Sequence, residues 1–173
     1  LLETRQASLD QRLRDIAGLS ASAKQADGER SEDLNQTLGE ALLAPTRIYA
    51  QLIHALLDEH PIDAMAHITG GGLLENINRS IPAGLTVQLN PASWPRPAVF
   101  RWLQGEYQDS GTRIDATEML RTFNCGIGFV LIVAAEHSQA LLEDLAQRGE
   151  KAWHIGQVLN SADASAAATV VLS

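Results

Sequence analysis

Three consecutive glycines at positions 70–72 stand between a short apolar run and a segment with helical spacing, and they constrain the fold more than any other feature. Residues 64–68 predict a buried strand, and residues 73–79 predict a short helix that Pro82 ends. Glycine permits positive φ values and close approach of the backbone to a ligand. Strand, glycine turn and helix N-terminus together offer unpaired N–H groups, which suit an anion such as phosphate.

The same glycines also fit a plain tight turn, and the residues alone leave both interpretations open. No Lys-Ser/Thr pair follows them, so this is not a Walker loop, nor is it the dinucleotide pattern. His67, at the end of the predicted strand, fits a proton donor or acceptor. It equally fits a hydrogen-bonded histidine buried at a strand end.

The remaining pattern mixes short helices with short strands, which predicts one α+β (or α/β) domain over residues 1–173, a mixed sheet flanked by helices. Thr46 is the expected cap of a helix whose broad apolar stripe predicts deep burial. A surface loop is predicted at 20–36. The other predicted helices cover 1–19, 38–43, 99–106, 116–121 and 137–148, and the other strands cover 85–89, 129–134, 151–159 and 168–172.

Composition excludes several classes of protein. The formal net charge of −8 and pI of about 5.0 argue against a nucleic-acid partner and an anionic membrane surface. No apolar run approaches the length of a transmembrane helix. Cys125 is the single cysteine, so no internal disulfide forms and a reducing, cytoplasmic setting is expected. The chain opens on Leu1 inside a segment with helical spacing, which we interpret as a trimmed chain.

Two further segments carry polar residues that suit a site. In residues 44–49, Arg47 falls in an expected first helical turn, where its charge opposes the helix dipole. That misfit suggests pairing with a carboxylate or a phosphate. In residues 118–128, Asn124 fits either a ligand-binding residue or a turn cap. Cys125 has no neighbouring His or Lys to activate it, so we do not expect a nucleophile.

The histidines lie on separate elements without paired ligand spacing, so no metal site is predicted. Residues 58–60 combine two carboxylates with a histidine, but they end a helix and predict a solvated terminus.

Taken in this order, residues 42–49, 67–76 and 118–128 resemble the C-terminal half of the aminoimidazole ribonucleotide synthetase (phosphoribosylformylglycinamidine cyclo-ligase) family. The resemblance runs from about residue 37 to 158, and residues 151–158 are similar to a late strand of the family. Asn78 stands where that family usually has proline. Cys125 and Phe129 stand where methionine is usual. None of these departures removes an expected ligand.

The resemblance implies closure of an imidazole ring. In that family ATP phosphorylates the formyl oxygen of formylglycinamidine ribonucleotide, the amine attacks that carbon, and phosphate leaves to give aminoimidazole ribonucleotide. The N-terminal domains of the family pair in a homodimer and carry most contacts to ATP and Mg²⁺. Residues 1–173 would then be the C-terminal domain without that ATP-binding half, and we expect no activity from them alone.

The resemblance also assigns residues. Thr69 and the glycines Gly70, Gly71 and Gly72 would receive a phosphate of the substrate or of ATP, and His67 would orient or protonate the reacting oxygen. The expected polar wall consists of Arg47, Asn76 and Asn124. Two alternatives stay open: a related ATP-dependent synthetase of the same superfamily, and a standalone ligand-binding or regulatory domain without catalysis.

Overall fold

The structure, a computed structural model, describes residues 43–105 and 113–173. The predicted helix at 1–19 and the predicted loop at 20–36 lie outside these ranges, as does nearly all of the predicted helix at 38–43. The internal contacts divide the chain into two units. The main unit comprises Arg47–Arg96 and Asp115–Ser173, and it holds every element of the site.

The other unit contributes one described helix, α5 (Ala98–Gln104). The helix begins after Pro97, whose fixed φ suits a helix start, and ends at Gly105 with φ 89°. The Gln104 side chain donates to the Ile114 carbonyl at 3.3 Å. The helix predicted at 99–106 is therefore confirmed, one residue earlier at its start.

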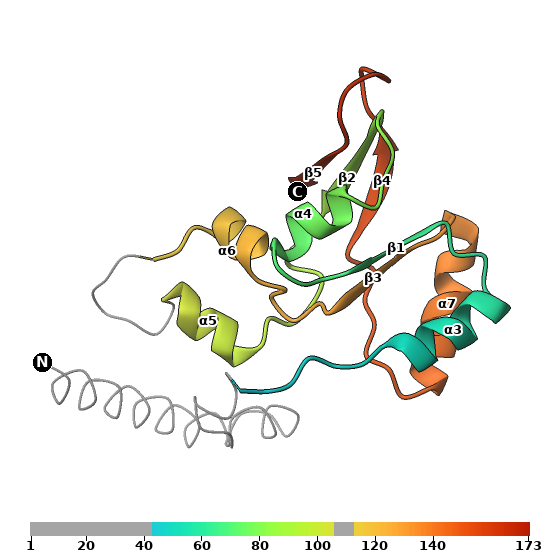
Figure 1. Cartoon of the computed structure of the whole chain (residues 1–173), viewed down its shortest axis with the longest axis horizontal. Coiled ribbons are helices and arrows are strands. Elements are labelled where there is room, and N and C mark those ends of the chain that lie inside the picture. The colour runs from blue at the N-terminus through green and yellow to red at the C-terminus, as the bar shows by residue number, and fades with distance from the viewer. Residues whose placement is uncertain (1–42, 106–112) are drawn as a thin grey trace, which may run out of the picture. The chain divides into compact units, whose positions relative to one another are not determined.

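The main unit mixes helices and strands, so the predicted α+β class is confirmed (Figure 1). In chain order its elements are α3 (Ala50–Glu59), β1 (Ala64–His67), α4 (Gly72–Asn78), β2 (Leu85–Leu89), α6 (Ala116–Thr122), β3 (Phe129–Ile132), α7 (Ala135–Gln147), β4 (Gly156–Asn160) and β5 (Thr169–Leu172).

The strands form two sheets. A mixed sheet has the order β4-β2-β5, in which β2 runs antiparallel to β4 and parallel to β5. β1 and β3 form a separate antiparallel pair, with His67 opposite Phe129. The predicted strand at 151–159 is only partly correct, because β4 begins at Gly156. Within the described parts of the chain, no helix has the length and apolarity needed to cross a bilayer.

One core lies where α3 and α7 pack beside the β1–β3 pair (Figure 1). Its buried residues are Ile53, Leu56, Leu141 and Leu145. The buried members of this core are all aliphatic, in a chain with 5% aromatic residues.

Two expectations about α3 are wrong. Thr46 does not cap the helix, because Tyr49 occupies the N-cap position and supplies no side-chain cap. The apolar stripe is also narrower than predicted, since Ile48 is 87% and Leu57 43% exposed. The N-cap residue of α3 is thus Tyr49, whose ring packs against the rings of His67 and Phe129.

A second packing group joins α4 to α6. Leu73, Ile77, Met119 and Leu120 are buried there. Gly72 lies so close to α6 that a Cβ on it would overlap the Leu120 carbonyl oxygen and come within 2.7 Å of the Arg121 carbonyl carbon. This close approach fixes the position of Gly72, the first residue of α4 and the last glycine of the turn.

Candidate functional site

The three sequence segments meet around the ring of Tyr49, in a group that we call the Tyr49 cluster: Arg47, Tyr49, His67, Gly128 and Phe129. The Tyr49 ring lies 5.7 Å from the His67 ring and 5.3 Å from the Phe129 ring, measured between centroids. The Arg47 guanidinium carbon lies 5.5 Å from the Tyr49 centroid. Residues from the start of α3, the end of β1 and the start of β3 thus form one group.

His67 is the last residue of β1 and lies directly opposite Phe129 in the strand pair. The two rings stack with centroids 5.7 Å apart and planes inclined by 23°, as cross-strand partners on one face do. The His67 residue is exposed to solvent. The interpretation of His67 as a buried, hydrogen-bonded histidine is therefore wrong.

Gly128 makes room for Tyr49. A Cβ on Gly128 would overlap the Tyr49 hydroxyl oxygen and lie 2.9 Å from the ring carbon that bears it. The Gly128 carbonyl also accepts a hydrogen bond from the Ile68 N–H at 2.9 Å, which extends the β1–β3 ladder. The glycine at 128 is therefore required by packing against Tyr49.

Arg47 pairs with a carboxylate, one of the two partners that its sequence position suggested. Its guanidinium forms an ion pair with Glu150, and the hydrogen bond that Arg47 donates to the Glu150 carboxylate raises the pKa of Arg47. The helix-dipole argument for Arg47 is wrong, because α3 begins three residues later at Ala50.

Asn76 anchors the glycine turn from inside. Its side chain is 8% exposed, and its Nδ2 donates to the carbonyls of Thr69 (3.3 Å), Gly70 (3.1 Å) and Gly72 (2.7 Å). In a trans peptide the C=O and the following N–H point in opposite directions. The N–H groups of Gly70 and Gly71 are therefore directed away from Asn76. Its amide is thus engaged within the turn, and the wall position expected for it finds no support in these contacts.

The three glycines of the turn have different surroundings. A Cβ on Gly70 would meet nothing within 4 Å, so this position is open. Gly71 has φ 95°, and a Cβ there would lie 2.5 Å from a carboxylate oxygen of Glu75. Glu75 is paired with Arg79 at 2.8 Å, at the i, i+4 spacing that places the two side chains next to each other on a helix. A phosphate bound here would have Glu75 beside it, and Arg79 would partly offset that repulsion.

In the second glycine segment, residues 118–128, the polar groups of the turn form hydrogen bonds within the protein. The Asn124 Oδ1 accepts the Gly126 N–H at 3.0 Å, which is the turn-cap role. Cys125 is fully buried with φ 48°, and burial raises the pKa of its thiol to about 11. Trp94 Nε1 donates to the Cys125 carbonyl at 3.0 Å. Cys125 is thus a protonated core residue, as expected, and Asn124 serves the turn.

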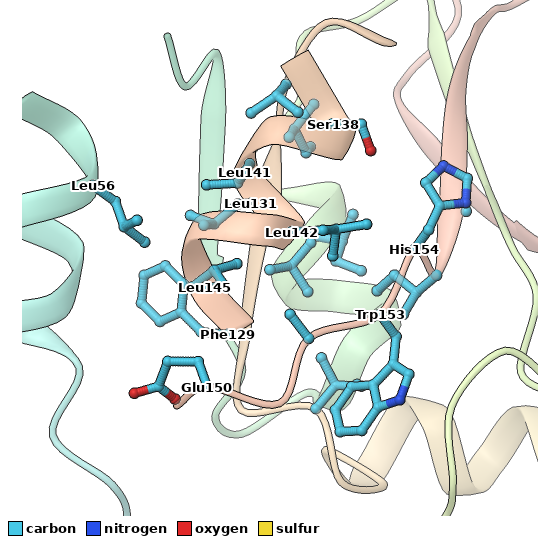
Figure 2. A pocket seen from close by; sticks show the side chains of 18 of the residues that line it. Leu56, Phe129, Leu131, Ser138, Leu141, Leu142, Leu145, Glu150, Trp153 and His154 are labelled. Carbon is cyan, nitrogen blue, oxygen red and sulfur yellow. The ribbon is translucent and has the colours of Figure 1, made fainter. Parts of the chain in front are cut away.

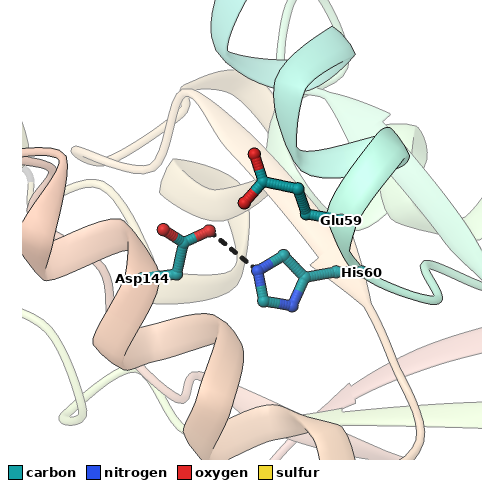
Figure 3. A group of neighbouring side chains, drawn as sticks. All are labelled: Glu59, His60 and Asp144. Carbon is teal, nitrogen blue, oxygen red and sulfur yellow. Dashed lines mark hydrogen bonds and ion pairs between the residues drawn. The ribbon is translucent and has the colours of Figure 1, made fainter.

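The predicted solvated terminus at 58–60 is only partly correct, because Asp58 and Glu59 are exposed whereas His60 is not. His60 Nε2 lies 2.8 Å from Asp144 Oδ2, with only 13% of its side chain exposed (Figure 3). Arg148 contacts Asp144 at 2.8 Å and Glu59 at 2.6 Å. Hydrogen bonds from Arg148, and then from His60, lower the pKa of the Asp144 carboxyl.

Glu59, His60 and Asp144 also have ligand atoms within 4.8 Å of one another, the spacing of a metal site. The Arg148 guanidinium, however, already forms ion pairs with both carboxylates and would have to leave before a cation could bind. We therefore interpret this group as an ion-pair network that joins the end of α3 to α7.

A cavity of about 940 Å³ borders the Tyr49 cluster. Figure 2 shows Phe129, a member of that cluster, among the side chains that line the cavity. Arg47, Tyr49, Gly128 and Phe129 line one part of it. The rest of its wall is largely apolar and includes Leu141, Leu142, Leu145, Trp153 and His154. Trp153, Glu150 and Phe129 contribute to this region, yet no sequence motif singled out their contacts.

Comparison with known proteins decides the family. The family described as "AIR synthase related protein, C-terminal domain" matches residues 14–168. The chain belongs to this family. The resemblance inferred from the three segments is therefore confirmed.

Two curated bacterial relatives are named phosphoribosylformylglycinamidine cyclo-ligase. That of Burkholderia ambifaria is 44% identical over 86% of this chain and 41% of its own length, and that of Chromobacterium violaceum is 46% identical over 73% and 35%. The human trifunctional purine biosynthetic protein adenosine-3 is 47% identical over 76% of this chain and 12% of its own length. The chain thus spans about two fifths of the length of the Burkholderia relative.

Proposed function

We propose that this chain forms the C-terminal wall of a phosphoribosylformylglycinamidine cyclo-ligase active site. The observation that carries the proposal is the Tyr49 cluster: three segments far apart in sequence converge there, and His67 is exposed next to Tyr49 and Phe129, which line a cavity. The names of the bacterial relatives support the same activity. The reaction would convert formylglycinamidine ribonucleotide to aminoimidazole ribonucleotide.

His67 is the proposed catalytic residue. Transfer of a phosphoryl group from ATP to the formyl oxygen makes that oxygen a leaving group, and attack by the amine nitrogen on the same carbon then closes the ring and releases phosphate. An exposed imidazole with two ring nitrogens can orient the formyl oxygen or carry a proton to it. Phe129 stacks on one face of the His67 ring and Tyr49 lies at a steep angle to it, so a substrate would approach from the side that these two rings leave open.

The turn at residues 69–72 is the proposed phosphate subsite. Asn76 holds three of its carbonyls inward, which directs the N–H groups of Gly70 and Gly71 outward. Gly70 has free space around it. A bound phosphate would require the Glu75 carboxylate to move away from Gly71, because the two negative groups would otherwise repel.

The remaining machinery is proposed to come from the portion of the relatives that this chain does not span. That N-terminal half would make most of the contacts to ATP and Mg²⁺. It would also pair with a second copy to form a homodimer, and the enzyme would be cytoplasmic. Arg47 would serve at the wall only by exchanging Glu150 for a phosphate oxygen. Residues 1–173 alone are expected to lack cyclo-ligase activity.

Reconstitution tests the proposal. The full chain is mixed with the N-terminal portion of the Burkholderia relative, and ADP release is measured with formylglycinamidine ribonucleotide. The mixture should be active and each part inactive. His67→Gln should lower kcat/KM by roughly 100-fold, the low end for loss of a general acid or base. His137→Gln, at an exposed site on α7, is the control and should retain activity.

Two results would reject the proposal. Full activity of the His67→Gln mixture would remove His67 from the chemistry. One tight ligand bound by the chain alone, without activity in any mixture, would favour a standalone binding domain.

A further inference from the structure

The geometry points to Tyr49 as a positioning residue that sets the orientation of the His67 imidazole. This inference rests on the proposed role of His67 in the reaction. Tyr49 touches no reacting group in the proposal, and it acts only through the ring of His67.

The His67 ring has two aromatic neighbours that restrict it in different directions. Phe129 stacks on one face, with planes inclined by 23°. Tyr49 meets the ring nearly edge-on, at 68° and a centroid distance of 5.7 Å. A ring held by a stacked partner alone can still slide and turn in its own plane. The edge contact from Tyr49 restricts that remaining motion.

Tyr49 is itself fixed at both ends of its side chain. Its backbone forms the N-cap of α3, and its hydroxyl fits against the backbone of Gly128 with no room for a Cβ there. The Arg47 guanidinium lies 5.5 Å from the centre of the ring and is held by Glu150. The orientation of His67 is therefore tied to a residue 18 positions away by contacts that none of the sequence motifs implies.

Gly128 gives a way to move Tyr49 without removing it. Gly128→Ala places a methyl group where the Tyr49 hydroxyl lies, so the tyrosine ring must shift. Tyr49→Phe removes the hydroxyl oxygen and leaves two ring carbons at 2.9 and 3.3 Å from that methyl, a smaller overlap. The double variant should therefore recover much of what Gly128→Ala loses, which a nonspecific packing defect would not do.

The experiment uses two measurements. In the reconstituted enzyme, Gly128→Ala and Tyr49→Leu should each lower kcat about tenfold with KM changed by less than about twofold, because a misplaced catalytic group slows chemistry more than binding. Tyr49→Phe alone should stay within about threefold of the unsubstituted enzyme, and Tyr49→Phe/Gly128→Ala should regain about threefold or more over Gly128→Ala.

The second measurement is independent of activity. In NMR spectra of the full chain, the ring C–H resonances of His67 are shifted by the neighbouring aromatic rings, and His67→Gln identifies them by their loss. Gly128→Ala should move these resonances, and the double variant should return them toward their original positions. Those of His54, an exposed residue of α3, should stay unchanged and serve as the control.

Unchanged His67 resonances in Gly128→Ala and Tyr49→Leu would overturn the inference, as would a double variant no better than Gly128→Ala. Failure of the proposed function has a different signature. In that case His67→Gln is fully active, while the His67 resonances still respond to Gly128→Ala and return in the double variant.

Discussion

The two glycine-rich turns of the main unit look alike in sequence, but their glycines do different things. In the turn at residues 69–72, Gly70 is open, and three carbonyls face the buried Asn76 side chain. In the turn at residues 124–128, Gly128 is packed against Tyr49, and the Cys125 carbonyl accepts a hydrogen bond from the indole of Trp94.

This difference separates the two reasons for a glycine. Gly72 and Gly128 are required because another part of the chain lies where a Cβ would be, and Gly71 because its φ is 95°. Gly70 meets neither requirement. The first turn therefore leaves the space around Gly70 open, whereas at Gly128 of the second turn that space is filled by Tyr49.

The largest expected effect comes from Gly72→Ala. A methyl group there would overlap the backbone of α6, and the φ of 56° at this position is strained for alanine. We therefore expect a loss of about 3 kcal/mol in the free energy of unfolding, measured with urea. Gly70→Ala is the matched control and should stay within about 0.5 kcal/mol. Equal losses in the two variants would contradict the distinction between a packed and an open glycine.

Asn76→Asp should be the next in size. The substitution replaces a donor that faces three carbonyl oxygens with an acceptor, and should cost about 2 kcal/mol at pH 7. The introduced carboxyl would have a raised pKa in the folded state, because its ionised form is disfavoured there. Stability relative to the unsubstituted chain should therefore recover as the pH falls, when the protonated acid donates again.

The control for this variant is Asn78→Asp, at an exposed position of the same helix. It should cost about 0.5 kcal/mol or less, through the helix dipole alone. A loss in Asn76→Asp that does not depend on pH would show that the three carbonyls do not need this donor.

Trp94→Phe should have a smaller effect, confined to the second turn. It removes the Nε1 hydrogen bond to the Cys125 carbonyl and should cost about 1 kcal/mol in urea unfolding. Trp153→Phe, at a half-buried residue of the cavity wall, is the comparison and should cost less. The reverse order would mean that the indole of Trp94 is not what closes this turn.

The smallest effect is expected from a thiol reagent. Burial raises the pKa of Cys125 to about 11, so at pH 8 only about one thousandth of the thiol is the reactive thiolate. Iodoacetamide should leave the folded chain unmodified over hours and modify it readily in urea. Rapid alkylation of the folded chain would show that the second turn opens, and Trp94→Phe should then accelerate it further.

Much of the local structure was predictable because it depends on neighbouring residues. The glycine turn, the strands 85–89 and 64–68, and the short helices that flank them follow from apolar spacing and from glycine and proline punctuation. The start of α3 was not predictable in the same way. Thr46 is a good cap by residue type, but Tyr49 takes the position where its ring reaches His67 and Phe129.

The site shows the same division. The residue types at positions 47, 67, 69–72, 76 and 124 indicated a polar, anion-tolerant region, and their order indicated the family. Their partners were invisible, because Glu150 lies 103 residues from Arg47 and Asp144 lies 84 residues from His60. Contacts over such separations leave no periodic signal in the chain.

By itself, the sequence determined the α+β class, the strand, glycine turn and helix around His67, and membership of the AIR synthase related family. These depend on backbone conformation and on short motifs, which neighbouring residues control. Only the tertiary structure decided that the Asn76 side chain faces the carbonyls of the glycine turn, that the absence of a Cβ at Gly128 makes room for Tyr49, and that His67 is exposed. Each of these depends on which distant side chain occupies a given volume, and close packing settles that only once the chain has folded.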